Sequence, residues 1–180
     1  MNIKPLITTI LFIIITTLSS CGLPFLSDDQ KVGEKRQFST TDPAFNSYTA
    51  KFEQDGRNKT GDQNFIIGDI PINFGDTEDA NHQGICVKYS DGSSEIIIRK
   101  AWWDTQTDQY RESLIYHELG HCRLGRGHDN TTTTQQNVSY KTSMMNQYII
   151  GPALYTTYKD AYLDELFNNS SVQIIIALSN

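Results

Sequence analysis

The chain has 180 residues, of which 38% are hydrophobic and 20% are charged, and its formal net charge is −6. That length suits a single domain with a real hydrophobic core. The acidic balance, without any cluster of Lys or Arg, argues against a nucleic-acid-binding surface.

The first twenty residues have the pattern of a secretion signal. Lys4 is their only charged residue, and an apolar and threonine-rich run covers residues 6–18, which is too short to span a bilayer comfortably. Residues 18–21, Leu-Ser-Ser-Cys, resemble a bacterial lipobox, whose cysteine is lipidated and begins the mature protein. We therefore expect a signal peptide over 1–20, a lipid on Cys21 and attachment to the cell envelope. Gly22 points to the outer membrane, and a plain signal peptide or an uncleaved anchor is the alternative.

The polar stretch after Cys21 predicts a flexible tether over residues 21–41, followed by one folded domain over 42–180. Asp42 and Pro43 can start a helix, and Gly56 can end it. Residues 65–74 are rich in β-formers and predict a strand, in which Pro71 indicates an edge position or a break.

Alternating apolar residues on both sides of a Ser-Asp-Gly-Ser turn predict a β-hairpin over residues 84–100. The longest helix is expected over 105–124, with apolar residues on most of its faces. A polar loop follows, and a closing helix is expected over 152–167. The apolar tail 172–178 is too short to span a bilayer and is expected to pack as a strand or a helical turn. The fold class is therefore α+β.

Three of the four histidines lie within residues 117–128. His117 and His121 are four residues apart, so one helical face presents both imidazoles to one point. Such a pair, with a third ligand, holds zinc in catalytic sites and leaves one position for water. Glu118 lies beside the first ligand, where a carboxylate can act as the general base. Gly125 can end the helix and return the chain, so that His128 arrives as the third ligand.

These residues resemble the metzincin clan of zinc endopeptidases, whose pattern is HExxHxxGxxH followed by a methionine turn. His117, Glu118, His121, Gly125 and His128 match the first part, and Ser143-Met144-Met145 matches the turn and nominates Met145. The resemblance implies one catalytic zinc ion, a peptide or protein substrate, and a small mixed sheet packed on a long active-site helix. It also implies a C-terminal helix after the turn. We expect a monomer.

The chain departs from the clan at one place, because three residues rather than two separate His121 from Gly125. One additional helical residue rotates the exit of the chain by about 100°. Either the last turn is wound differently, or Asp129 replaces His128 as the third ligand. A tyrosine two residues after the turn methionine often stabilises the transition state in this clan. Tyr148 is three residues after Met145, so its assignment is a weak one.

Cys86 and Cys122 are the other two cysteines, and an exported protein favours a disulfide between them over two separate buried thiols. In the clan, an edge strand pairs with the substrate backbone. Chain order nominates residues 95–99 for that strand, with an internal hairpin strand as the alternative.

Three alternatives compete with a metzincin-like peptidase. The first is a non-catalytic domain stabilised by zinc, and the second is an envelope binding module with a coincidental histidine cluster. The third is a different peptidase arrangement, in which Glu165 is the third ligand and His128 has no role.

Overall fold

The computed structural model describes residues 30–31, 34–77, 79–170 and 172. The signal peptide, Cys21 and most of the tail lie outside these residues, so the structure does not bear on those expectations. Among the described residues, no helix is long and apolar enough to cross a membrane. The described part is a mixed α+β domain, in agreement with the predicted class.

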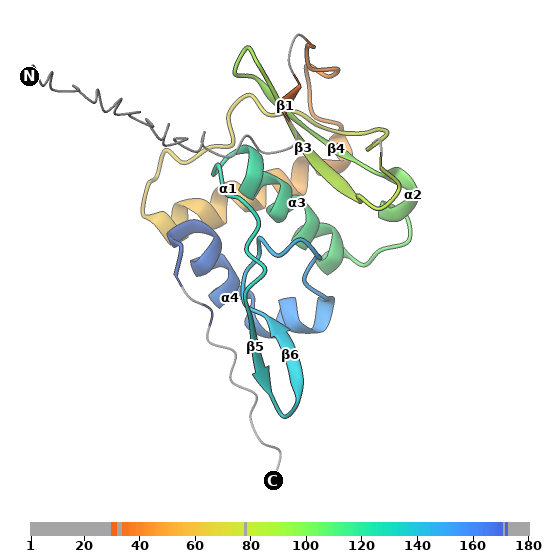
Figure 1. Cartoon of the computed structure of the whole chain (residues 1–180). Helices are drawn as coiled ribbons and strands as arrows, with labels where there is room; N and C mark the ends of the chain where they lie inside the picture. Colours follow the sequence, from red (N-terminus) through yellow and green to blue (C-terminus); the bar gives the residue numbers. More distant parts are fainter. Residues whose placement is uncertain (1–29, 32–33, 78, 171, 173–180) are drawn as a thin grey trace, which may run out of the picture.

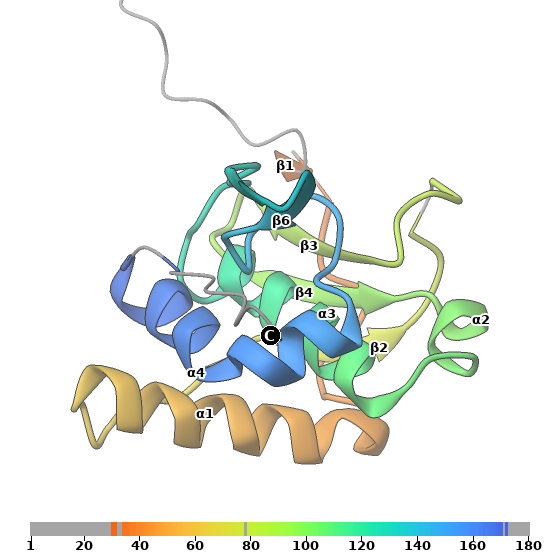
Figure 2. The ribbon, with the colours of Figure 1, turned by 90° about the horizontal axis from the view of Figure 1, so that it is seen from below.

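The main sheet has the strand order β1-β3-β4-β2 (Figures 1 and 2). β1 is Gln30–Lys31, β2 is Ile72–Phe74, β3 is Gly84–Tyr89 and β4 is Ser94–Ile98. β3 and β4 form the predicted antiparallel hairpin, whereas β1 pairs with β3 and β2 pairs with β4 in parallel. Since β4 lies between β3 and β2, residues 95–99 are not an edge strand. The internal alternative is the correct one.

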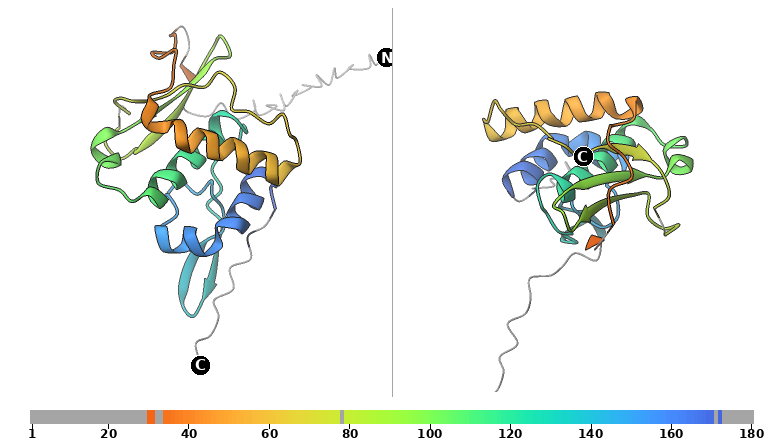
Figure 3. Two further views of the ribbon diagram at one scale, coloured as in Figure 1. Left: turned by 180° about the vertical axis from the view of Figure 1, so that it is seen from behind. Right: turned by 90° about the horizontal axis from the view of Figure 1, so that it is seen from above.

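The helices form layers on one side of this sheet. The helix α3, Asp108–Cys122, packs directly on β3 and β4. Two further helices, α1 (Asn46–Thr60) and α4 (Pro152–Asn168), contact the side of α3 that faces away from the sheet (Figure 2). Seen from behind, α1 lies in front of these other layers (Figure 3). α2, Lys100–Trp103, connects the hairpin to α3. The main core lies between the sheet and the helices, so α3 is buried on most of its faces as expected.

Several predicted boundaries differ from the observed ones for local physical reasons. Asp42 caps a short 3-10 helix, Pro43–Phe45, and α1 follows it and ends at Gly61, which has φ +76°. Gly56 is instead buried inside α1, where an added Cβ would lie 2.4 Å from the ring of Phe65. Of residues 65–74, only β2 is a strand, and it begins directly after Pro71.

The expected loop after His128 contains a second antiparallel hairpin. β5, Thr132–Gln135, pairs with β6, Val138–Lys141. Gln136 and Asn137 make the turn with φ values of +51° and +63°. The hairpin projects at the end of the molecule opposite the main sheet (Figure 1). Asn tolerates this left-handed conformation better than most residues, which is the signal that predicts a turn here.

The end of the expected tether is packed onto the sheet, and we call residues 34–41 the strap. Gln37 and Phe38 donate their backbone N–H groups to the Glu95 carboxylate at 3.0 Å. The Phe38 ring covers Val87, Tyr89 and Ile97 on the outer face of the sheet. Glu95 has no exposed surface, and the hydroxyl of Tyr89 also donates to it. The strap is therefore a structural part of the domain.

Candidate metal centre

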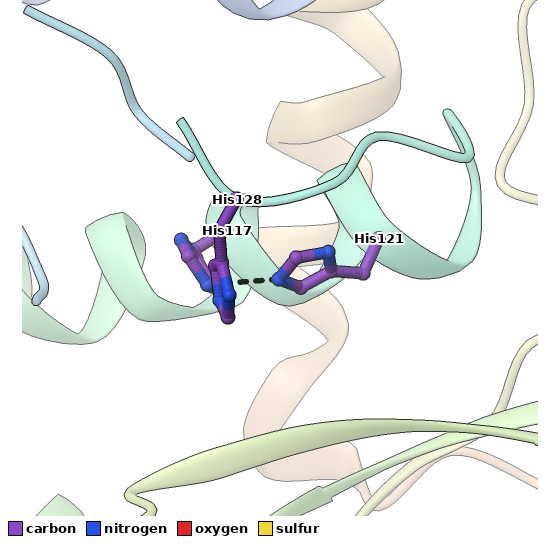
Figure 4. A group of neighbouring side chains, drawn as sticks. All are labelled: His117, His121 and His128. Carbon is purple, nitrogen blue, oxygen red and sulfur yellow. Dashed lines mark hydrogen bonds between the residues drawn. The ribbon is translucent and has the colours of Figure 1, made fainter. Parts of the chain in front are cut away.

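Three histidine side chains converge at the C-terminal end of α3. His117 and His121 belong to the last two turns of the helix, and His128 comes from the segment that returns after it (Figure 4). One ring nitrogen from each histidine lies within 4.8 Å of the other two. Among the described residues, this is the one group of three or more His, Cys, Asp or Glu side chains that lie close enough together to hold a metal ion.

Hydrogen bonds to two backbone carbonyls fix the tautomers of His117 and His121. The Nδ1 of His117 lies 2.9 Å from the carbonyl oxygen of Met144, and the Nδ1 of His121 lies 2.7 Å from that of Arg126. A carbonyl oxygen can only accept a hydrogen bond, so in each ring Nδ1 carries a proton, and in the neutral form of the ring Nε2 presents a lone pair. Such contacts orient histidine ligands in metal sites.

The two Nε2 atoms face each other at 3.0 Å (Figure 4), and between two neutral rings in this tautomer neither nitrogen can donate to the other. Two lone pairs at that distance repel unless a cation lies beside both. Zinc–nitrogen bonds of about 2.0–2.1 Å in tetrahedral geometry would hold two ligand nitrogens about 3.3 Å apart. The residues therefore fit a metal ion such as zinc.

Burial keeps His117 neutral, which ligation requires. The side chain is 5% exposed. Desolvation lowers the pKa of His117 to about 3, and repulsion from His121 and His128 acts in the same direction. The hydrogen bond to Met144 opposes the shift of this pKa but does not outweigh it.

The end of α3 shows how the additional residue is accommodated. The helix ends at Cys122, and the N–H of Leu124 bonds to the carbonyl of Leu119, five residues back rather than four. The N–H of Arg126 bonds to the carbonyl of Gly120, and Gly125 adopts the left-handed conformation with φ +67°. The last turn is thus wound more widely, and His128 still reaches the cluster. Gly125 has the conformation expected from the sequence.

The two carboxylates considered as replacement ligands are engaged elsewhere. Asp129 accepts hydrogen bonds from the N–H and the hydroxyl of Thr131. Glu165 binds Arg126 and the Ser143–Met144 turn. Neither belongs to the metal-binding group, so the geometry favours His128 as the third ligand.

Met145 packs against α3 at Gly120. Its side chain has no exposed surface, and a Cβ added to Gly120 would lie 2.3 Å from the Met145 sulfur. The glycine between the two helical histidines therefore makes room for the methionine. The N–H of Asp129 bonds to the carbonyl of Met145 at 2.9 Å, which joins the turn to the segment carrying His128.

Glu118 is buried between α3 and the start of β3. An added Cβ on Gly84 would lie 3.0 Å from Oε1 of Glu118, so the carboxylate rests against the strand backbone. Glycine at position 84 is what permits this close approach. Glu118 follows His117 directly in the chain, and its carboxylate does not belong to the group formed by the three histidines.

Three other predicted site residues, Cys86, Cys122 and Tyr148, have defined positions. The structure joins Cys86 of β3 to Cys122 of α3 by a disulfide with a Cα–Cα distance of 5.5 Å. It links the strand beside Glu118 to the residue after His121. Tyr148 is 67% exposed, and the Lys141 ammonium lies 5.6 Å from its ring centroid. No contact described for Tyr148 connects it to the three histidines.

The sequence did not indicate the groups that orient the histidines. Backbone carbonyls carry no residue signature, so the roles of Met144 and Arg126 are visible only once the chain is folded. The ion pair of Glu165 with Arg126 does have a sequence signal, because an acidic residue on an otherwise buried helix face indicates a buried ion pair.

No family model, curated protein or solved structure matches the chain. The likeness to metzincins therefore rests on residues 117–128 and 143–145 and on the geometry described above.

Proposed function

We propose that this protein is a zinc-dependent endopeptidase of metzincin type. The observation that carries the proposal is the convergence of three histidine nitrogens within 4.8 Å, together with a buried glutamate that directly follows the first of them in the chain. A site that only stabilises the fold is usually closed by a fourth protein ligand, whereas catalytic sites use three. Among the described residues no fourth ligand accompanies the three histidines.

The chain's own residues divide the chemistry between them. His117, His121 and His128 would hold the ion through ring nitrogens, while the carbonyls of Met144 and Arg126 keep two of the rings in place. A zinc ion supplies a Lewis acid that polarises a substrate carbonyl and acidifies water. Glu118 would take the proton from the attacking water and pass it to the departing amine.

The edge of β3 that faces away from β4 is suited to hold an extended peptide. The N–H of Arg99 bonds to Gln83 and that of Tyr89 bonds to Ser93, so alternate residues of β3 face β4. Gly84 and Cys86 therefore direct their backbone groups to the opposite edge. In the described part of the chain, β1 pairs there only with Lys88 and Tyr89. The substrate would pair with Gly84 and Cys86, next to Glu118.

The location is part of the same proposal. The lipobox-like residues 18–21 would place a lipid on Cys21 and hold the domain at the outer membrane of a bacterial envelope. An oxidising location outside the cytoplasm agrees with the disulfide between Cys86 and Cys122. Mass spectrometry of the protein released from membranes tests the lipid, and an unmodified Cys21 would contradict it.

Exchange of Glu118 for Gln tests the proposed catalysis. The full-length wild-type protein should bind one zinc ion per chain and cleave members of a broad peptide library. Glu118→Gln should retain the zinc but cleave about 10²–10⁴-fold more slowly, because the amide cannot accept the proton. Glu112→Gln, a buried carboxylate on the same helix, is the matched control and should keep its activity per folded molecule.

Equal inertness of the wild type and Glu118→Gln, with zinc present in both, would favour a non-catalytic zinc domain. Absence of metal binding in the wild type would favour a binding module with a coincidental cluster. His82→Ala serves as the control for histidine substitutions, because His82 lies outside the metal-binding group.

A further inference from the structure

Glu165 of α4 has a buried carboxylate, and both of its oxygens accept hydrogen bonds. It is 4% exposed. Its Oε1 accepts hydrogen bonds from the guanidinium of Arg126 and, at 2.8 Å, from the hydroxyl of Ser143. Its Oε2 accepts the backbone N–H of Met144 at 2.9 Å. The carboxylate thus binds both segments that surround the histidine cluster.

One path leads from Glu165 to His117 through a single residue. Met144 donates its N–H to the carboxylate and accepts the Nδ1 proton of His117 on its carbonyl at 2.9 Å. Since both ends of this residue are bonded, a displacement of the carboxylate would move the carbonyl that orients the ring. The N–H of Met145, bonded to the Ser143 hydroxyl at 3.0 Å, closes the turn.

A second path leads from Glu165 to His121 through Arg126. The guanidinium binds the Glu165 carboxylate and also the carbonyls of Glu165 and Leu166, at 2.7 and 3.2 Å. The backbone carbonyl of the same arginine accepts the Nδ1 proton of His121 at 2.7 Å. His128 follows Arg126 by two residues, so the arginine also fixes the start of the segment that carries the third ligand.

We propose that Glu165 is the positioning residue of the metal centre, and that its carboxylate sets the orientation of two ligand imidazoles through the carbonyls of Met144 and Arg126. This inference rests on the proposed metal site. It assigns α4 a part in metal binding, although none of its side chains belongs to the histidine group. Groups behind metal ligands commonly change metal affinity by about 10–100-fold when they are removed.

Glu165→Gln is the variant that tests this role. A glutamine has one acceptor oxygen and one NH2 group, so it cannot satisfy Arg126, Ser143 and Met144 together, because one of these donors would face another donor. We expect zinc affinity, measured on the full-length protein by competition with a chelator, to fall by about 10–100-fold. The visible absorption spectrum of the Co²⁺-substituted protein should change in band position or intensity, because the ligand geometry changes.

Glu112→Gln distinguishes positioning from general stability. Glu112 is also a buried carboxylate, bonded to Lys51, Lys159 and Tyr155, and it connects α3 to α1 and α4. Its exchange should lower the unfolding temperature but leave the zinc affinity and the Co²⁺ spectrum of the folded protein unchanged. If Glu165→Gln behaves in the same way, Glu165 is only structural and the inference is wrong.

Two further outcomes are informative. If the wild type binds no zinc, the proposed function fails before Glu165 is at issue. If Glu165→Gln does not fold, Arg126→Lys decides, because it keeps the positive charge but loses the planar fork that spans the carboxylate and two carbonyls. An unchanged zinc affinity in folded Arg126→Lys would overturn the inference, and a weakened one would support it.

Discussion

The two halves of α3 carry two polar clusters of opposite character, each of which contains one buried residue of this helix, Glu112 or His117. In the N-terminal half, Glu112 accepts hydrogen bonds from Lys51 of α1 and from Tyr155 and Lys159 of α4. Each acceptor there meets a donor. In the C-terminal half, His117 and His121 direct their protons outward to carbonyls and their lone pairs toward each other. The first cluster is complete within the protein, whereas the second is complementary to a cation.

The two clusters on α3 differ in how well their hydrogen-bond donors and acceptors match. Burial alone does not distinguish them, because Glu112 and His117 are both buried. The balance of hydrogen-bond donors and acceptors distinguishes the two clusters. A cluster in which donors match acceptors stabilises the fold without a ligand, and a cluster that presents only acceptors to its centre favours binding a positive ion.

The largest expected effect comes from removing a member of each cluster in turn. His121→Ala should weaken zinc binding by at least about 1,000-fold, since changes behind the ligands already cost about 10–100-fold. Glu112→Ala should instead lower the free energy of unfolding by about 3 kcal/mol, because it leaves the buried Tyr155 hydroxyl and two ammonium groups without their acceptor. Isothermal titration with zinc and urea denaturation measure the two effects.

The two clusters would not be independent if a single substitution disturbed both of them. Loss of zinc affinity in folded Glu112→Ala, or unfolding of metal-free His121→Ala under conditions where the metal-free wild type is folded, would mean that the clusters act as one.

The disulfide connects the C-terminal half of α3 to the sheet, whereas the N-terminal half is connected to α1 and α4 through Glu112. Cys86→Ser combined with Cys122→Ser should lower the free energy of unfolding by about 4 kcal/mol, from the chain-entropy cost of a sequence separation of 36 residues. The double variant should also bind zinc more weakly, because Cys122 is next to His121. Equal stability of the oxidised and reduced wild-type protein would contradict this prediction.

The smallest effect is a difference in the response to acid. His117 has a folded pKa of about 3, and an unfolded histidine titrates near 6.5. Between these values the unfolded state binds more protons, so the stability of metal-free protein should fall with falling pH by up to about 1.4 kcal/mol per unit. Urea denaturation at a series of pH values, with a chelator present, measures this slope.

Glu112 should respond only at lower pH. Burial raises the pKa of Glu112, but hydrogen bonds from Lys159, Lys51 and Tyr155 outweigh burial and hold this pKa below its usual value of 4.5. The stability it contributes is therefore present above pH 4.5 and is lost as the pH falls through the folded pKa. His117→Ala should reduce the slope between pH 6.5 and 4.5, whereas Glu112→Gln should not. If Glu112→Gln reduced this slope and His117→Ala did not, the loss of stability between pH 6.5 and 4.5 would belong to Glu112 instead of His117.

Local chemistry made much of the site predictable. The spacing of His117 and His121 on one helical face, and a glycine able to adopt positive φ before His128, are properties of neighbouring residues. The same holds for the hairpin over residues 84–100, whose alternation and turn residues specify β3 and β4. The structure has each of these features where the sequence placed them.

The remaining features depend on contacts between distant residues. β2 pairs with β4 across 24 positions, as in the register of Ile72 with Ile96, and this makes β4 internal. The strap packs because the buried Glu95 side chain accepts hydrogen bonds from the backbone N–H groups of residues 37 and 38. Glu165 meets Arg126 only when α4 folds back on the end of α3. No local pattern encodes such pairings.

The contact between Gly120 and Met145 has an evolutionary consequence. Any side chain at position 120 would collide with the methionine sulfur, 2.3 Å from where its Cβ would lie. In relatives that share this packing, the residue between the two helical histidines and the residue of the methionine turn should covary, with a larger side chain at one compensated by a smaller one at the other. A position that the metal motif leaves variable is thus constrained by its neighbour in space.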